Sequence, residues 1–178
     1  MQVKSIELGA KELMDVYYYM RLGRAIEDRL NLLYKGGKLP GAIYLGTGQE
    51  AIEVGASYAL EPDDVIATTH RDMIAQLPRG LTPREVFSQH YGRITSLTRG
   101  KGEDNYQGDL KRGMLASVSM LPNFYPVAAG CALAFKIRKE KRVAMAYCGE
   151  GATSVGDWHE TLNIASVQNL PVVFIVIN

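Results

Sequence analysis

Two glycines flank a single carboxylate in the turn Gly149-Glu150-Gly151-Ala152. The apolar stretch from Val143 to Cys148 predicts a buried strand that leads into this turn, and a helix is expected to follow it. Glycines let a backbone turn sharply and approach a ligand, and the N–H groups ahead of a helix bind phosphate oxygens. The pattern therefore predicts a phosphate subsite. Taken alone, it is also typical of a plain glycine corner that binds nothing.

Glu150 places one carboxylate beside this phosphate subsite. A carboxylate next to a diphosphate is explained if a Mg²⁺ ion bridges the two, because this ion takes one or two protein oxygens together with phosphate oxygens. A second apolar stretch, Val172 to Ile177, predicts another buried strand and ends at Asn178. The amide oxygen of Asn178 would reach the same place from the neighbouring strand end. We therefore predict a magnesium site with Glu150 and Asn178 as ligands.

The succession of strand, helix and strand in the C-terminal third implies parallel pairing through a right-handed crossover. It predicts an α/β fold with a doubly wound, mostly parallel sheet, in which ligands bind beyond the carboxyl ends of the strands. Apolar residues at three- and four-residue spacing, with turn and capping signals, predict further elements. These are helices over 11–35, 48–60, 82–91, 126–138 and 155–167, a strand over 65–68, and a glycine-rich loop over 99–113.

Composition limits the classes of protein that remain. The chain has 178 residues and is 47% hydrophobic, so one domain over 1–178 with a sizeable core is expected. A formal charge of +1 and the lack of a basic stripe argue against nucleic-acid binding. Apolar runs are far shorter than the roughly 20 residues that cross a bilayer, and Met1 to Gly9 has no signal-peptide core. We expect a cytoplasmic protein, or a mitochondrial matrix protein in a eukaryote, although no transit peptide is present.

The turn at Gly149–Ala152, Asn163 in the predicted helix and the strand that ends at Asn178 resemble the thiamine-diphosphate motif. Many enzymes with this motif have aspartate at the position of Glu150, and glutamate is found notably in branched-chain 2-oxoacid dehydrogenases. Further segments are similar, in the same order, to the alpha subunit of heterotetrameric 2-oxoacid dehydrogenases. They are 21–27, 48–51, 69–72 and 119–123, and the resemblance extends over nearly the whole chain from Tyr17.

This resemblance implies roles for individual residues. Arg71 would contact the diphosphate, with His70 beside it at a position where the family commonly has tyrosine. Leu121 would support the bent conformation of the cofactor and lies in the segment that receives the aminopyrimidine ring. The predicted cofactor-binding set is His70, Arg71, Ser119, Leu121, Gly149, Gly151 and Ala152. We expect Arg71 and Glu150 to converge on one pocket. No catalytic residue is predicted, because the family's activating glutamate belongs to the beta subunit.

The activity implied by the resemblance is oxidative decarboxylation of a 2-oxoacid on thiamine diphosphate and Mg²⁺, with acyl transfer to a lipoyl group. The implied partners are a beta subunit, in a heterotetramer, and a lipoyl-bearing acyltransferase. The 2-oxoacid stays open, since Tyr44 stands where pyruvate-specific relatives often carry histidine. Self-association, at least as a homodimer, is expected because the long apolar helices that carry Tyr17 to Tyr19 and a row of small residues suggest surfaces that close only against another chain. That row is Ala128, Gly130, Ala132 and Ala134.

The C-terminal end of the sequence bears on the completeness of the site. The family's second asparagine would follow Asn178, so we expect the domain to be truncated after a strand and the chain alone to be inactive. An alternative is a truncated, non-catalytic assembly module that keeps the fold without binding cofactor. A plain mononucleotide-binding domain would need a glycine fingerprint after an early strand, which the sequence lacks.

Overall fold

The protein is described from a computed structural model over residues 7–102 and 105–178. One sheet has the strand order β2-β1-β3-β4, and each neighbouring pair is parallel. The strands are β1 (Val65–Ala67), β2 (Met114–Leu115), β3 (Ala144–Gly149) and β4 (Val172–Ile177). The prediction of an α/β fold with a parallel sheet is confirmed.

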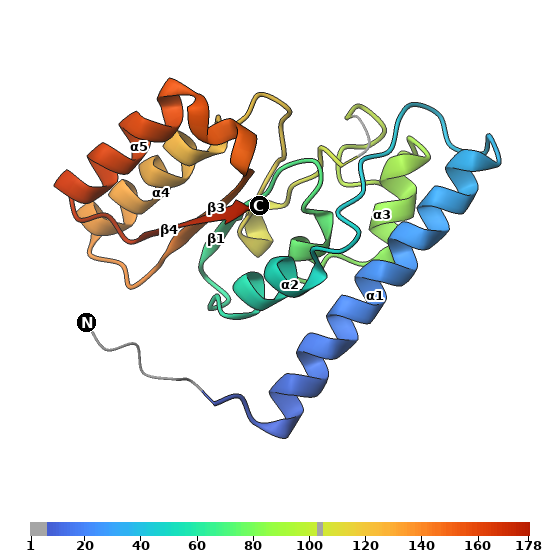
Figure 1. Cartoon of the computed structure of the whole chain (residues 1–178), viewed down its shortest axis with the longest axis horizontal. Coiled ribbons are helices and arrows are strands. Elements are labelled where there is room, and N and C mark those ends of the chain that lie inside the picture. The colour runs from blue at the N-terminus through green and yellow to red at the C-terminus, as the bar shows by residue number, and fades with distance from the viewer. Residues whose placement is uncertain (1–6, 103–104) are drawn as a thin grey trace.

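Helices cover both faces of this sheet (Figure 1). The α-helices are α1 (Ala10–Lys35), α2 (Glu50–Tyr58), α3 (Pro83–His90), α4 (Phe124–Arg138) and α5 (Gly156–Val167). Met145 and Tyr147 of β3 pack into the core on the side of α1, α2 and α3. Ala144, Ala146 and Cys148 pack on the opposite side, with α4. This burial on both faces explains why β3 is a continuous apolar run instead of an alternating one.

Local signals account for the helix ends. At the start of α3 the Thr82 hydroxyl accepts a hydrogen bond from the Glu85 amide at 3.3 Å, and the Glu85 carboxylate accepts one from the Thr82 amide at 2.9 Å. This reciprocal pair satisfies N–H groups that have no partner within the helix, and Pro83 at the first position has none to satisfy. The predicted helix start at Thr82 is therefore confirmed.

Four short elements were not predicted: β2 and the 3-10 helices η1 (Met73–Gln76), η2 (Leu110–Arg112) and η3 (Glu150–Ser154). A strand of two residues shows no periodicity, and β2 exists because Met114 pairs with Ile66. The helix predicted over 155–167 is confirmed as α5, and the turn residues from Glu150 onward form the short η3 ahead of it. The stretch 99–113, predicted as a loop, contains η2 and includes two residues outside the described ranges.

The prediction that a row of small residues on α4 forms an association surface needs correction. Ala128 and Ala132 are buried against the sheet, so they form the core face of the helix and not an association surface. Gly130 is exposed, on another side of the helix. None of the helices formed by the described residues combines the length and apolar character needed to span a bilayer. The segment assessed for a signal peptide, Met1 to Gly9, lies mostly outside these residues.

Candidate functional site

A pocket of about 310 Å³ lies at the carboxyl ends of β1, β3 and β4. Its lining comes from segments that are far apart in the sequence, which are 45–49, 69–72, Leu121, 149–150 and Ile177. The register explains the convergence, because Gly149 at the end of β3 pairs with Ile177 at the end of β4. This is the edge of a parallel sheet at which ligands bind in doubly wound folds.

The structure brings five of the predicted site residues into this lining. They are His70, Arg71, Leu121, Gly149 and Glu150. The expectation that Arg71 and Glu150 converge on one pocket is therefore confirmed. Ser119, Gly151 and Asn178 are exposed residues that do not line the pocket, and Ala152 is buried in the core beneath α4.

Arg71 offers an exposed positive charge at the mouth of the pocket. Its backbone N–H donates to the Thr69 hydroxyl at 3.2 Å, and the Thr69 N–H donates to the Asp72 carboxylate at 2.8 Å. These bonds hold the turn that follows β1. The Arg71 guanidinium carbon lies 5.9 Å from the centre of the Tyr44 ring. Within the described part of the chain this guanidinium makes no ion pair, so its donors are available to an anion.

His70 is half-buried beside Arg71, and its ring packs edge-on against Tyr44 with 4.7 Å between the ring centres. Burial and the nearby Arg71 charge lower the pKa of His70, so the ring is neutral at neutral pH. Asn105 was not predicted as a site residue. Its amide donates to the backbone oxygens of His70, at 2.7 Å, and Tyr44, at 3.1 Å, and fixes the two residues relative to each other.

The segment 45–49 also reaches the pocket without having been predicted to do so. Glu27 of α1 holds it, because its carboxylate accepts hydrogen bonds from the Gly46 N–H at 2.8 Å and from the Thr47 hydroxyl at 2.6 Å. Glu27 is buried on the apolar side of a long helix. A carboxylate at such a position is a signal in the sequence, because buried charges need hydrogen-bonding partners.

The side-chain oxygens at this edge of the sheet are suited to bind a Mg²⁺ ion that also binds a diphosphate. Glu150 is exposed directly after β3, and Asn178 is exposed directly after β4. A Cβ built on Gly149 or Gly151 would meet nothing within 4 Å, so the backbone there is open to a ligand. The described residues hold no group of three or more side chains suited to a metal by themselves. Mg²⁺ would therefore need phosphate oxygens as well, as it commonly does.

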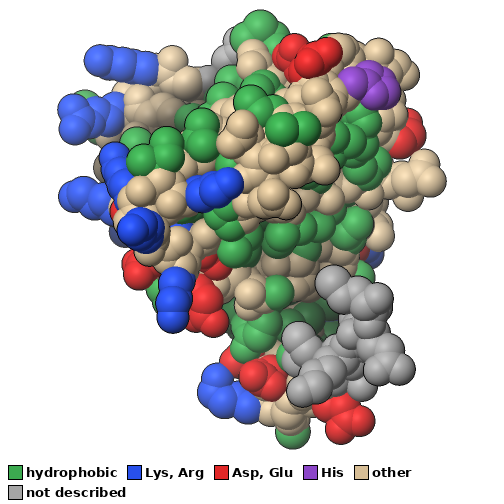
Figure 2. Space-filling model, turned by 90° about the vertical axis from the view of Figure 1, so that its left-hand side faces the viewer, with side chains coloured by type: hydrophobic (Ala, Val, Ile, Leu, Met, Phe, Trp, Pro, Cys, Tyr) green, Lys and Arg blue, Asp and Glu red, His purple; other side chains and the backbone are tan. Residues whose placement is uncertain are grey.

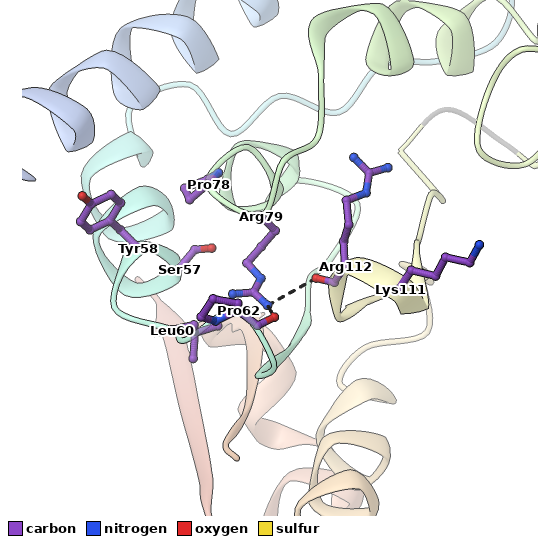
Figure 3. A pocket seen from close by; sticks show the side chains of 8 residues that line it. All are labelled: Ser57, Tyr58, Leu60, Pro62, Pro78, Arg79, Lys111 and Arg112. Atoms are coloured by element: carbon purple, nitrogen blue, oxygen red, sulfur yellow. Dashed lines mark hydrogen bonds between the residues drawn. The ribbon is translucent and has the colours of Figure 1, made fainter. Parts of the chain in front are cut away.

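A larger cavity, of about 460 Å³, lies at the opposite end of the sheet (Figure 3). Arg79 lines it and donates to the backbone oxygens of Glu61 at 2.7 Å, Pro62 at 2.7 Å and Asp64 at 2.8 Å. Arg112 beside it pairs with the Glu85 carboxylate at 2.9 Å. Both guanidinium groups are thus used in joining the loops that precede β1 and β2. We regard this cavity as structural.

Comparison with known proteins agrees with the geometry. Residues 18–178 match the family described as Dehydrogenase E1 component. The chain is 36% identical over 174 residues to the alpha subunit of acetoin:2,6-dichlorophenolindophenol oxidoreductase from Cupriavidus necator, covering 98% of this chain and 52% of that protein. It is 33% identical over 177 residues to the 2-oxoisovalerate dehydrogenase subunit alpha of Bacillus subtilis, covering 98% and 53%.

The pyruvate dehydrogenase E1 component subunit alpha-3, chloroplastic, of Arabidopsis thaliana is 32% identical over 180 residues, covering 98% of this chain and 42% of that protein. The chain therefore spans about half the length of the curated relatives that it matches. The matched range, 18–178, contains the residues that line the pocket, Arg71 and Glu150 among them. Each of these relatives is named as an alpha subunit of an oxidoreductase or dehydrogenase.

Proposed function

This chain belongs to the dehydrogenase E1 component family, and from that premise we propose that it binds thiamine diphosphate and Mg²⁺ in the pocket between Arg71 and Glu150. One observation carries the proposal. An exposed guanidinium and an exposed carboxylate, placed after two neighbouring parallel strands, line the same pocket. A diphosphate needs the first group and its bound Mg²⁺ needs the second.

Each residue of the site would then have a defined part in binding. Arg71 and the backbone N–H groups of the turn at Gly149–Gly151 would hold phosphate oxygens, and Glu150 and Asn178 would supply oxygen ligands to Mg²⁺. Leu121, on the apolar part of the lining, would support the bent cofactor. His70 is neutral and adds no charge, so Arg71 provides the main electrostatic attraction. When bound, thiamine diphosphate supplies the carbanion chemistry that decarboxylates a 2-oxoacid.

The whole protein would act as the alpha subunit of a 2-oxoacid dehydrogenase. We propose that a beta subunit completes the site with the activating glutamate, and that the acyl group passes to the lipoyl group of an acyltransferase. The names of the relatives support an alpha-subunit role, and they include proteins named for acetoin, pyruvate and 2-oxoisovalerate. The substrate class we propose is therefore a 2-oxoacid or a related ketone. This chain would anchor the cofactor and supply no general acid or base.

Calorimetric titration of the full-length protein with thiamine diphosphate, with and without Mg²⁺, tests the binding proposal. We expect saturable binding that requires Mg²⁺. Arg71→Ala should weaken it by about 10- to 100-fold, since a hydrogen bond to a charged group contributes about 1.5–3 kcal/mol. Glu150→Gln should abolish the Mg²⁺ requirement together with most of the affinity. Arg84→Ala, an exposed arginine on α3, is the matched control.

Two results would contradict the proposal. Wild-type protein that binds no thiamine diphosphate would favour the alternative of a non-catalytic assembly module. Binding that is equally strong in the wild type, Arg71→Ala and Glu150→Gln would show that the cofactor binds at another site.

A further inference from the structure

Three carboxyl groups are buried behind one wall of the pocket. The wall consists of the loop Gly46–Thr47 and the loop Thr69–Asp72, which both line the pocket. Glu27 on α1 is 1% exposed, Glu53 on α2 is 0% exposed, and Asp72 is 2% exposed. Three buried acids in one place are costly unless each is hydrogen-bonded or neutral.

Hydrogen bonds account for two of the three. Glu27 accepts from the Gly46 N–H and the Thr47 hydroxyl, and Asp72 accepts from the Thr69 N–H. Glu53 differs, because its Oε2 accepts one long bond from the Ala75 N–H at 3.2 Å. Its Oε1 is buried and has no hydrogen-bond donor among the described residues. A fully buried carboxylate oxygen without a donor requires an explanation.

The position of Gly46 shows what lies next to this oxygen. A Cβ built on Gly46 would clash with both the Glu53 Oε1 and the backbone carbonyl oxygen of Arg71. The two oxygens therefore lie close to the same point beside the Gly46 Cα. Acceptor oxygens that lie near each other repel, whereas a proton on one of them would let it donate a hydrogen bond toward the other.

Charged groups around Glu53 favour this proton. Burial, followed by the negative charges of Asp72 and Glu27, raises the pKa of Glu53 well above its ordinary value. Glu50 on the same helix acts in the same direction, and Arg24 of α1 pairs with that residue at 2.6 Å. The Tyr147 hydroxyl of β3 donates to the Glu53 backbone oxygen at 3.2 Å, so this hydrogen bond does not stabilise a charge on the Glu53 carboxyl group.

We propose that Glu53 is a positioning residue whose uncharged carboxyl group donates a hydrogen bond to the Arg71 carbonyl oxygen, and so joins the two loops of the pocket wall. The inference rests on the proposed function in one respect, namely that the Arg71 side chain contacts the diphosphate. Ionisation of Glu53 would place a carboxylate against the Arg71 carbonyl and two further acids. The wall would then separate, and Arg71 would lose its fixed position.

The sign of the expected pH dependence follows from the raised pKa. Unfolded chains release the Glu53 proton near the ordinary value of 4.5, and the native protein keeps it to a higher pH. The stabilising contribution is complete below the unfolded pKa and is lost as the pH rises through the native pKa. Between the unfolded and the native pKa, the native state binds one more proton than the unfolded state. The unfolding equilibrium constant therefore increases by up to about tenfold for each unit by which the pH rises.

Denaturant unfolding of the full-length protein between about pH 5 and pH 9 tests the inference without any cofactor. Glu53→Gln keeps a donor for the Arg71 carbonyl and an acceptor for the Ala75 N–H, and it cannot ionise. We expect the free energy of unfolding of the wild type to fall as the pH rises, and that of Glu53→Gln to fall clearly less. Some pH dependence should remain in Glu53→Gln, because burial also raises the pKa values of Glu27 and Asp72. Glu12→Gln, at an exposed position on α1, should keep the wild-type slope.

Cofactor titration separates a positioning role from a structural one. Glu53→Gln should bind thiamine diphosphate and Mg²⁺ within about twofold of the wild type, and Glu53→Leu, which has no donor, should bind at least about fivefold more weakly. The affinity of the wild type, but not of Glu53→Gln, should fall at alkaline pH. If the wild type binds no cofactor while Glu53→Gln still flattens the stability slope, the proposed function fails and the bond between the loops stands.

Other outcomes overturn the inference. Parallel stability slopes for the wild type and Glu53→Gln would show that Glu53 does not change its protonation state in this range. A Glu53→Gln protein that fails to fold at about pH 6 would also contradict it, because the amide is isosteric with the neutral acid. Infrared spectra of the wild type at about pH 7 give an independent check, since the absence of any protonated-carboxyl band would rule out an uncharged Glu53.

Discussion

Gly46 shows how one residue without a side chain permits the pocket wall to form. A Cβ added to it would clash with a buried carboxyl oxygen of Glu53 and with the carbonyl oxygen of Arg71, and its N–H donates to the Glu27 carboxylate. The requirement for glycine here is one of space, because any Cβ would clash with both oxygens. The residue that leaves this space beside Arg71 is therefore distant from it in the sequence and contributes no side-chain chemistry.

Gly46→Ala should destabilise the protein by about 1–3 kcal/mol, the usual cost of forcing extra volume into a packed site. The matched control is Gly55→Ala on α2, where an added Cβ would meet nothing within 4 Å. Alanine at that helical position should stabilise by up to about 1 kcal/mol. Urea unfolding at about pH 7 measures both changes. Equal effects of the two substitutions would contradict the close packing at Gly46.

Among the elements, α3 is tied through its first turn to the segment that leads into β2. The Glu85 carboxylate accepts hydrogen bonds from Thr82 and forms an ion pair with Arg112, which lies two residues before the strand β2. A single carboxylate thus caps a helix and fixes the approach to an edge strand. Although burial raises it, hydrogen bonds from Arg112 and Thr82 hold the pKa of Glu85 below its ordinary value, so the group is charged at neutral pH.

Thr82→Ala should reduce the free energy of unfolding by about 1 kcal/mol, since the substitution removes the N-cap acceptor of α3. Thr95→Ala provides a comparison, because this exposed threonine caps no helix and should change stability by less than about 0.5 kcal/mol. Thermal unfolding followed by circular dichroism gives both values. A Thr82→Ala protein as stable as the wild type would show that the cap is not required.

At the scale of the whole molecule, two separate sets of helices bury the sheet, and apolar side chains remain exposed on the outside of both sets. Figure 2 shows hydrophobic side chains gathered over the middle of the face that is turned toward the viewer. The exposed apolar side chains of α4, α5 and β4 are Val127, Ile137, Val155, Ile164, Val167 and Val173, with those of α5 beginning at its N-cap. Apolar groups in such number are typical of surfaces that contact another chain.

We therefore expect the full-length protein to associate at least as a dimer. Val167→Glu, at a side chain that is 68% exposed, should shift the sedimentation profile toward smaller species because it places a charge on the apolar surface of α5. Ser166→Glu adds the same charge at the neighbouring position, on a different side of the helix, and should have little effect. A wild-type protein that sediments as a single monomer over a wide concentration range would contradict this expectation.

The sequence alone determined the long elements and the corner of the site. Periodic apolar residues specify α1, and continuous apolar runs specify β3 and β4, because these patterns reflect the burial of each segment's own residues. The capping residues that begin at Thr82 specify the start of α3. The turn at Gly149–Ala152 and the position of Arg71 were also predicted, from local composition and from the family resemblance. Both Arg71 and Glu150 line the predicted pocket.

Only the tertiary structure decided which other groups surround that pocket. Strand β2 depends on pairing with β1, and the segment 45–49 reaches the pocket because Glu27 on another helix holds it. Ser119 and Ala152 belong to segments that resemble those of the family, but neither residue lines the pocket. Ser119 is exposed, and Ala152 is buried in the core. The charge state of Glu53 depends on carboxyl groups from three segments. Interactions between residues that are distant in the sequence leave no periodic pattern along the chain, so only the tertiary structure identifies them.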